Sequence, residues 1–224
     1  MTKNHLKRLA TPRTWNIGRK SSKLIVRPYG YLEFALPVAL ILREFLHLTK
    51  SRLETKRVVN AKKVSLDGKT VRDDKLPAGI MSVLNINGTD SYRVLLNKKG
   101  KLFLNKLDAK ESSTKLCKIV SKTMLKGGKM QLGFHDGRTI LTTNKAAGIN
   151  DTIVFKLPEF NVEKHLKLAK GASVYLTGGS NVGSTGTVEN VSDSVVVKIN
   201  DRVVETGKEN VFVIGEASPL IKLD

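Results

Sequence analysis

The chain has 224 residues, of which 39 are Lys or Arg and 20 are Asp or Glu, and its formal net charge at pH 7 is +19. A charge excess of this size is typical of proteins that bind polyanions, and RNA and DNA are the first candidates. The densest apolar run, Phe34 to Leu42, contains Pro37 and is far shorter than the roughly 20 residues of a membrane-spanning helix, so we expect no membrane contact.

The positive charge is concentrated toward the N-terminus. Residues 1–63 carry 15 basic and 3 acidic side chains, whereas residues 171–224 carry 4 basic and 7 acidic ones. We therefore expect the first part of the chain to meet the anion and the last part to present an ordinary protein surface. The single cysteine, Cys117, excludes an internal disulfide and a multi-cysteine metal site. No secretory signal is visible, so we expect a cytoplasmic protein.

Residues 1–33 are expected to form a basic N-terminal arm. Their first 27 positions include eight Lys or Arg and no Asp or Glu, so like charges repel one another without internal compensation. We expect this arm to become ordered only when RNA supplies the negative charge. Trp15 either stacks on an unpaired base or packs against the folded body, and both interpretations stay open here. The candidate RNA-binding residues of the arm are Lys3, Lys7, Arg8, Arg13, Trp15, Arg19, Lys20, Lys23 and Arg27.

Two helices are predicted after the arm. Pro37 suits the first turn of a helix, and apolar residues then recur at three- and four-residue spacing up to Leu48. Thr49 or Ser51 can cap a second helix that runs to about Ala61. Its apolar side includes Leu53 and Val59, which we expect to pack the helix onto its neighbour.

A β-hairpin follows the helices. Val64 and Leu66 alternate with a polar residue, and Asp67-Gly68 predicts a tight turn before the next short strand. A further strand is predicted over Ile80–Ile86.

The second helix and the hairpin carry a dense set of cations. Between Lys50 and Leu66 the only acidic residue is Glu54, whereas solvated surface helices usually mix both signs. Arg52 and Lys56 are four positions apart and therefore share one helical face. We expect this basic face to follow a phosphate backbone. Its candidate RNA-binding residues are Arg43, Lys50, Arg52, Lys56, Arg57, Lys62, Lys63, Lys69 and Arg72.

From residue 91 onward the sequence predicts short strands separated by turns. Turn signals recur every eight to twelve residues, as in a small barrel or sandwich. The last block, from Gly171, contains five strand patterns in about fifty residues, the size of an SH3-like barrel. The predicted strands are Tyr92–Leu96, Leu102–Leu104, Leu116–Met124, Met130–Phe134, Thr139–Thr142, Thr152–Leu157, Ser173–Leu176, Gly186–Val191, Val195–Ile199, Arg202–Glu205 and Val211–Ile214.

No cofactor, metal or catalytic site is predicted. In the loop Gly178–Gly186, two glycines have the spacing of a nucleotide-binding P-loop, but Ser184 stands where that motif needs Lys, and strands flank it instead of a helix. Either a tight turn or a close approach to RNA or a neighbouring protein accounts for its glycines. The four histidines have no metal-ligand spacing. We expect Cys117 to be a buried, inert thiol.

Ordered motifs along nearly the whole chain are similar to those of one ribosomal family. The segment Val58 to Lys69 resembles an S-four RNA-binding domain, and the wider set resembles ribosomal protein S-four-e of archaea and eukaryotes. The motifs are Lys7–Pro12, Trp15, Arg27-Pro28, Leu36-Pro37, Asp67–Lys69, Pro77–Val83, Tyr92–Leu95, Lys115–Lys118, His135–Ile140, Thr177–Gly183 and Asn210–Gly215. The chain stops soon after Gly215, without the extension of eukaryotic members, which favours an archaeal-type protein.

The resemblance implies a β-rich α+β protein in four parts. They are a basic arm (1–33), an S-four-type helix–hairpin RNA-binding domain (34–90), a central β domain (91–170) and a KOW-type, SH3-like barrel (171–224). It implies a structural, non-catalytic component of the small ribosomal subunit in the cytoplasm, with small-subunit ribosomal RNA and neighbouring ribosomal proteins as partners and no small-molecule substrate. The alternatives are an RNA-binding regulator of translation or transcription and an RNA-modification accessory protein.

Overall fold

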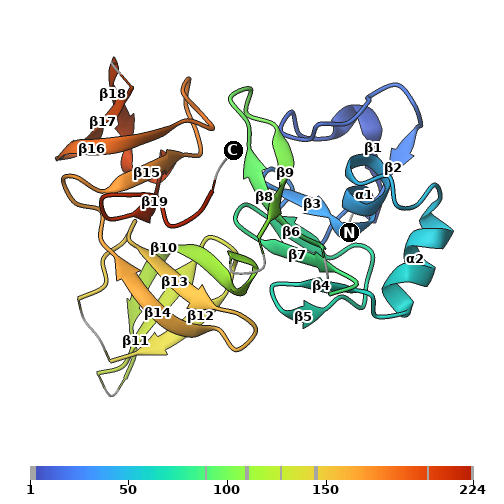
Figure 1. Cartoon of the computed structure of the whole chain (residues 1–224), viewed down its shortest axis with the longest axis horizontal. Helices are drawn as coiled ribbons and strands as arrows, with labels where there is room; N and C mark the ends of the chain where they lie inside the picture. Colours follow the sequence, from blue (N-terminus) through green and yellow to red (C-terminus); the bar gives the residue numbers. More distant parts are fainter. Residues whose placement is uncertain are drawn as a thin grey trace. The chain divides into compact units, whose positions relative to one another are not determined.

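The chain forms two compact units, Met1–Ser113 and Thr114–Asp224, in a computed structural model (Figure 1). The structure describes residues 4–88, 90–108, 111–126, 128–143, 146–200 and 202–222. In these residues antiparallel strands dominate, and the two α-helices both belong to the first unit. The expected β-rich α+β fold is confirmed at this level.

The first unit combines a five-stranded antiparallel sheet with two small strand pairs and short helices. The sheet has the order β5-β4-β7-β8-β9, and the pairs are β1-β2 and β3-β6. The elements are β1 (Leu6–Lys7), η1 (Arg8–Ala10), β2 (Leu24–Ile25), β3 (Ala35–Pro37), α1 (Val38–Leu40), the π-helical turn η2 (Ile41–Phe45), α2 (Arg52–Asn60), β4 (Val64–Leu66), β5 (Lys69–Thr70), β6 (Pro77–Gly79), β7 (Val83–Ile86), β8 (Asp90–Leu96), β9 (Leu102–Leu107) and η3 (Glu111–Ser113).

The main sheet continues past residue 90, where the sequence predicted a domain boundary. β8 pairs with β7 through Val83 and Arg93, and β9 pairs with β8 along its whole length. Val94, Leu95 and Leu96 are buried, so these strands complete the core begun by β4 and β7. Pairing and burial together place β8 and β9 in the first unit.

The N-terminal arm is folded against the rest of the first unit. Leu6 pairs with Ile25, and the backbone N–H of Leu102 donates to the carbonyl of Thr14 at 2.7 Å. Trp15 is only 2% exposed, and its indole N–H donates to the Leu32 carbonyl at 3.0 Å. The expectation of an arm that is ordered only with RNA is therefore corrected, and the second interpretation of Trp15, packing against the body, is the one the structure shows.

The first helical segment is shorter than predicted. It begins after Pro37, where the N–H groups of Val38 and Ala39 donate to the carbonyls of Leu76 and Asp74. It ends in the π-helical turn η2 because the chain turns away at His47, whose φ is +52°. Leu48 lies beyond this turn and is exposed, so it does not extend the apolar face.

The second helix matches the prediction in place but not in orientation. Ser51 caps it, since its side chain accepts a hydrogen bond from the Glu54 N–H at 3.2 Å. Thr55 and Val59, four positions apart, form its buried face, whereas Leu53 is 63% exposed. The prediction that Leu53 packs inward is wrong, because burying the short Thr55 side chain rotates Leu53 toward solvent. The Thr55 hydroxyl lies 2.8 Å from the hydroxyl of Thr49, which satisfies both buried groups.

The second unit consists of two five-stranded antiparallel sheets. Their strand orders are β12-β11-β10-β13-β14 and β18-β17-β16-β15-β19. The elements are β10 (Thr114–Met124), β11 (Met130–Phe134), β12 (Thr139–Thr142), β13 (Thr152–Lys156), β14 (Asn161–Leu166), β15 (Ser173–Leu176), β16 (Thr185–Val191), β17 (Ser194–Ile199), β18 (Arg202–Gly207), η4 (Lys208–Asn210) and β19 (Val211–Gly215).

Two side chains connect the sheets of the second unit. The ammonium group of Lys118, on β10, donates to the carbonyls of Lys208 and Glu209 at 2.9 and 2.7 Å. The ring of His135 packs edge-on against Phe212 of β19, with 5.3 Å between ring centres. Cys117, on β10, is buried in a core of apolar side chains, as expected.

Candidate nucleic-acid interface

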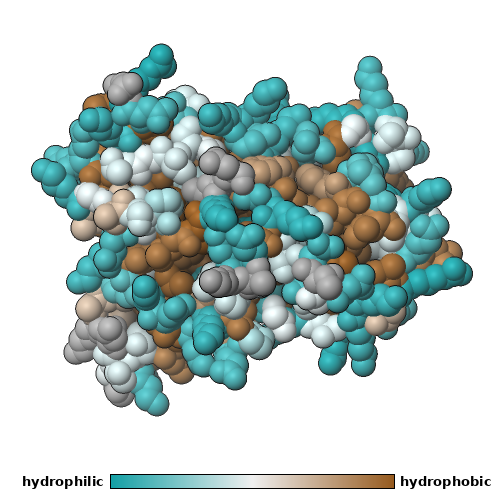
Figure 2. Space-filling view, viewed as in Figure 1, coloured by the Kyte–Doolittle hydropathy of each residue, from teal (hydrophilic) through white to brown (hydrophobic). Residues whose placement is uncertain are grey.

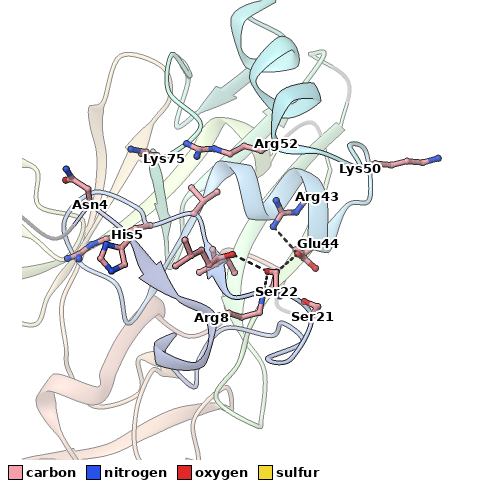
Figure 3. A pocket seen from close by; sticks show the side chains of 14 residues that line it. Asn4, His5, Arg8, Ser21, Ser22, Arg43, Glu44, Lys50, Arg52 and Lys75 are labelled. Atoms are coloured by element: carbon pink, nitrogen blue, oxygen red, sulfur yellow. Dashed lines mark hydrogen bonds and ion pairs between the residues drawn. The ribbon is translucent and has the colours of Figure 1, made fainter.

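A basic cleft opens in the first unit between the arm, the turn η2 and the start of α2 (Figure 3). Its volume is about 550 Å³. Of its fourteen lining residues, six are Lys or Arg and one, Glu44, is acidic. The lining consists of Asn4, His5, Arg8, Ser21, Ser22, Leu24, Ile25, Val26, Arg27, Arg43, Glu44, Lys50, Arg52 and Lys75.

Part of this positive charge is neutralised inside the cleft. Arg8 and Arg43 both donate to the same oxygen of Glu44, at 3.2 and 3.1 Å. Burial alone would raise the pKa of Glu44, but the hydrogen bonds from the two guanidinium groups and their charges outweigh it, and the pKa is lowered. Arg8 also donates to Ser22 and to the carbonyl of Gly18, so its guanidinium group is engaged on several sides.

Arg52 is held by a second carboxylate. Its Nε donates to the buried Asp74 at 2.7 Å, and this hydrogen bond raises the pKa of Arg52. The Arg52 side chain is still 44% exposed, so one side of the guanidinium group faces solvent. Arg52 therefore fixes the start of α2 to the segment before β6 and also contributes to the surface of the cleft.

The other three cations of the cleft are available to an anion. Among the described residues, Arg27, Lys50 and Lys75 form no ion pair with a carboxylate. Lys50 is exposed, and its side chain extends away from the other labelled groups in Figure 3. A cleft with three such cations can bind phosphate groups by charge and hydrogen bonding.

The structure brings together only part of the predicted site. Five predicted residues line the cleft: Arg8, Arg27, Arg43, Lys50 and Arg52. Eleven others do not line it: Lys7, Arg13, Arg19, Lys20, Lys23, Lys56, Arg57, Lys62, Lys63, Lys69 and Arg72. Lys3 lies outside the described residues.

All eleven of these cations outside the cleft are exposed, and none of them is even partly buried. Arg52 and Lys56 share one exposed face of α2, as their spacing predicted. Contact of these cations with RNA stays a prediction.

Two of the predicted contacts are buried. Arg8 lines the cleft but is only 3% exposed and engaged with Glu44, and Trp15 is buried with its indole N–H bonded to a carbonyl. Both side chains have a structural role in the first unit, and contact of either with RNA stays a prediction.

Sequence reasoning missed nine of the fourteen lining residues, among them Asn4, His5 and the cation Lys75. Lys75 follows Asp73-Asp74, so its local charge pattern gave no signal of a basic site. Only the folded structure shows its role, because Asp74 pairs with Arg52 and Lys75 then lies beside the cleft.

The loop Gly178–Gly186 is shaped by packing. A Cβ on Gly178 would collide with the side-chain oxygen of Asn210, and a Cβ on Gly186 would lie 2.5 Å from the carbonyl of Lys198. The loop leads into strand β16. These close approaches leave no room for a side chain at either position, and Gly186 lies within β16 itself.

His135 and Asp136 are also structural. Nδ1 of His135 accepts a hydrogen bond from the Lys118 N–H at 3.2 Å. Asp136 binds Lys115 at 2.9 Å and Arg138 at 3.4 Å. In the described part of the chain, no group of three or more His, Cys, Asp or Glu side chains is arranged to hold a metal ion. No helix in that part is long and apolar enough to cross a membrane.

Comparison with known proteins gives the family. The chain is 35% identical, over 99% of its length and 98% of the relative's, to the small ribosomal subunit protein eS4 of Methanocella arvoryzae. The chain belongs to ribosomal family S4e. The model of this family, described as Ribosomal family S4e, matches residues 89–162. A second member, the small ribosomal subunit protein eS4 of Methanocaldococcus jannaschii, is 34% identical over 99% of this chain and 98% of its own length.

A solved structure of the same family supports the fold. The crystal structure of the 30S ribosomal protein S4e from Thermoplasma acidophilum is 35% identical in sequence and matches with a TM-score of 0.71. The match covers 82% of this chain and 95% of that chain. The resemblance to the S4e family, and to its archaeal members in particular, is therefore confirmed.

Proposed function

We propose that this protein is a structural component of the small ribosomal subunit, in the cytoplasm, and that it binds small-subunit ribosomal RNA. The observation that carries the proposal is the basic cleft, in which the side chains of Arg27, Lys50 and Lys75 form no ion pair among the described residues. It stands in a chain whose relatives are named small ribosomal subunit proteins. Cations of this kind bind phosphate and position a protein on RNA without reading its bases.

The exposed cations of the arm and of α2 extend this surface. Lys20 and Lys23 lie on the arm, and Lys56 and Arg57 lie on α2, all exposed. Because phosphates are regularly spaced along an RNA strand, cations spread over several elements bind it better than one isolated group. The protein acts by stabilising folded RNA, and it has no catalytic role.

The four-part organisation is proposed with one boundary moved. The arm and the S-four-type helix–hairpin domain together form the first unit, which ends at Ser113. The sheet of β10 to β14 is the central β domain. The sheet of β15 to β19 has the strand number of a KOW-type, SH3-like barrel. Because acidic residues outnumber basic ones in 171–224, this is the part we assign to neighbouring ribosomal proteins.

The first test is the salt dependence of binding to small-subunit ribosomal RNA. The logarithm of the affinity falls with the logarithm of the salt concentration, and each lost phosphate contact makes this fall less steep by about 0.7–0.9. Replacing Arg27, Lys50 and Lys75 together by Gln should therefore reduce the steepness by about 2 to 3. The matched control replaces Lys156, Lys164 and Lys167, three exposed lysines of the second unit, by Gln. An equal loss in both variants would show that net charge, and not the cleft, determines binding.

A second test separates this proposal from a regulatory role. A structural component co-sediments with the small subunit in a one-to-one ratio and remains bound at high salt. Substoichiometric or transient association would instead support an RNA-binding regulator.

A further inference from the structure

Tyr29 is an exposed aromatic side chain at the rim of the basic cleft. It is 53% exposed, and Arg27, two positions before it, lines the cleft. Lys75 also lines the cleft, and its ammonium group lies over the Tyr29 ring, 5.8 Å from the centre of the ring. The ring and the Lys75 ammonium group are therefore close enough to contact one bound nucleotide.

Tyr29 is held in place from two sides. Its hydroxyl donates to Asp73 at 2.6 Å, and its backbone N–H donates to the carbonyl of Lys75 at 3.3 Å. The hydrogen bond to Asp73 also raises the pKa of Tyr29. A ring that is already fixed loses little conformational freedom when a ligand stacks on it.

The two other aromatic candidates nearby in sequence do not offer such a surface. Trp15 is buried, as described above. Tyr31 is exposed, but its hydroxyl binds Glu33, and its ring packs against Phe34 with 6.2 Å between ring centres. Tyr29 alone combines an exposed ring with the cations of the cleft among these three residues.

We propose that the basic cleft receives an unpaired nucleotide of the RNA, with its base stacked on Tyr29 and its phosphate bound by Arg27 and Lys75. Protein contacts to RNA that depend on the base are made mainly to unpaired nucleotides, whose faces are open to aromatic side chains. The cleft lies within the roughly 300–1,000 Å³ of typical small-ligand sites, and exposed Leu24 adds an apolar contact to its lining. This inference rests on the proposed function, because it names the form of RNA that the same cleft binds.

The experiment compares two short RNA duplexes with the full-length protein. One duplex is fully paired, and the other is identical except for a single bulged 2-aminopurine nucleotide. We expect the bulged duplex to bind at least about fivefold more tightly, the lower end of what stacking of one base contributes. We also expect its fluorescence to be quenched, because 2-aminopurine loses emission when it stacks.

Three variants assign the effect to the ring. Tyr29→Leu should abolish the preference and the quenching while it leaves binding of the paired duplex unchanged. Tyr29→Phe keeps the ring and should keep both. Tyr31→Leu, the matched control, should behave like the wild type. Thermal unfolding of each variant checks that the first unit is intact.

The outcomes separate this inference from the proposed function. If both duplexes bind equally with a steep salt dependence, phosphate binding stands and the stacking inference is overturned. If Tyr29→Leu retains the preference for the bulge, the inference is likewise overturned. If neither duplex binds and small-subunit RNA does not bind either, the proposed function fails together with it.

Discussion

The guanidinium group of Arg8 lies 3.2 Å from the carboxylate of Glu44. This ion pair connects the arm, which has no acidic residue in its first 27 positions, to the turn η2. Glu44, which lies outside the arm, compensates the charge of Arg8 in the folded protein. Glu44 also binds Arg43, so one carboxylate serves two cations.

Replacing Glu44 by Gln should lower the free energy of unfolding by about 1–3 kcal/mol, because two guanidinium groups lose their charged partner. The effect should depend on pH in a definite direction. The pKa of Glu44 is lowered from its ordinary value of 4.5, so its contribution is present above pH 4.5 and is lost as the pH falls through the lower folded-state pKa. Urea unfolding at pH 7 and at pH 3 measures both effects.

The control for this prediction is Glu33→Gln. Glu33 is an exposed carboxylate that accepts a hydrogen bond from Tyr31. Glu33→Gln should lower the free energy of unfolding by less than about 0.5 kcal/mol. A cost for Glu44→Gln that is equally small, or that does not shrink at acidic pH, would contradict a structural ion pair.

Trp15 is the only tryptophan of the chain, so its fluorescence reports on the arm alone. Because it is buried, we expect blue-shifted emission from the free protein and a red shift on unfolding. Addition of RNA should leave the emission nearly unchanged. Red emission without RNA, followed by strong quenching when RNA binds, would show instead that the arm is disordered when free and that Trp15 stacks on a base.

The exposed cations of the arm can be tested without unfolding it. Deleting residues 1–27 would remove Trp15 and the β1-β2 pair, so substitution is the cleaner experiment. Replacing Arg13, Arg19, Lys20 and Lys23 by Gln should lower the salt slope of RNA binding by about 3. The same number of lysines replaced in the second unit, Lys156, Lys164, Lys167 and Lys170, is the control. A slope that is unchanged in the arm variant would mean that these residues do not contact RNA.

Burial lowers the pKa of Lys118 to about 8, against the opposing charge of Glu209. Above pH 8 the unfolded chain therefore binds more protons at this lysine than the folded one, and the contribution of Lys118 to the free energy of unfolding rises with pH up to its ordinary pKa of 10.5. Carbon-13 NMR of the lysine side chains should show Lys118 titrating near pH 8.

Lys118→Met tests the same group by stability. The variant leaves the carbonyls of Lys208 and Glu209 without their donor, and the stability difference from wild type should grow between pH 7 and pH 9. Lys156→Met, at an exposed position on β13, controls for the loss of a lysine. Titration of Lys118 above pH 10 would contradict the effect of burial.

Gly186→Ala should destabilise the second unit by about 1–3 kcal/mol, since the new methyl group would lie 2.5 Å from the Lys198 carbonyl and 2.6 Å from a methyl group of Val197. Gly207→Ala, in β18 of the same sheet, is the matched control, because its methyl group would meet only ordinary contacts of 3.7 Å or more. Thermal unfolding measures both. Equal stability of the two variants would show that the close approach at Gly186 is not needed.

Local signals predicted the strands and turns well. The Asp67-Gly68 turn forms with φ of +52° and +77°, and the strands after residue 91 lie close to their predicted positions, because alternation and turn residues act over a few neighbours. β14 was missed, since Val162, Glu163 and Lys164 are all exposed and leave no alternating pattern.

Signals that depend on distant residues could not be read from the sequence. The folding of the arm depends on Glu44, and the place of Lys75 in the cleft depends on the pairing of Asp74 with Arg52. Leu53 has the right spacing for an apolar face, but the choice between it and Thr55 is made by Thr49, six positions before Thr55. Composition identified the basic character of the chain, whereas tertiary contacts decide which cations are free.

Residues at opposite ends of the first unit's sequence meet in the folded protein. The N–H of Leu102 binds the carbonyl of Thr14, and the ammonium group of Lys101 lies 3.4 Å from Asn16, 85 positions earlier. During synthesis, these two contacts of the leading segment therefore cannot form until strand β9 has left the ribosome that makes it. Because translation runs from the N-terminus, the first unit can complete its fold only when nearly half of the polypeptide has emerged.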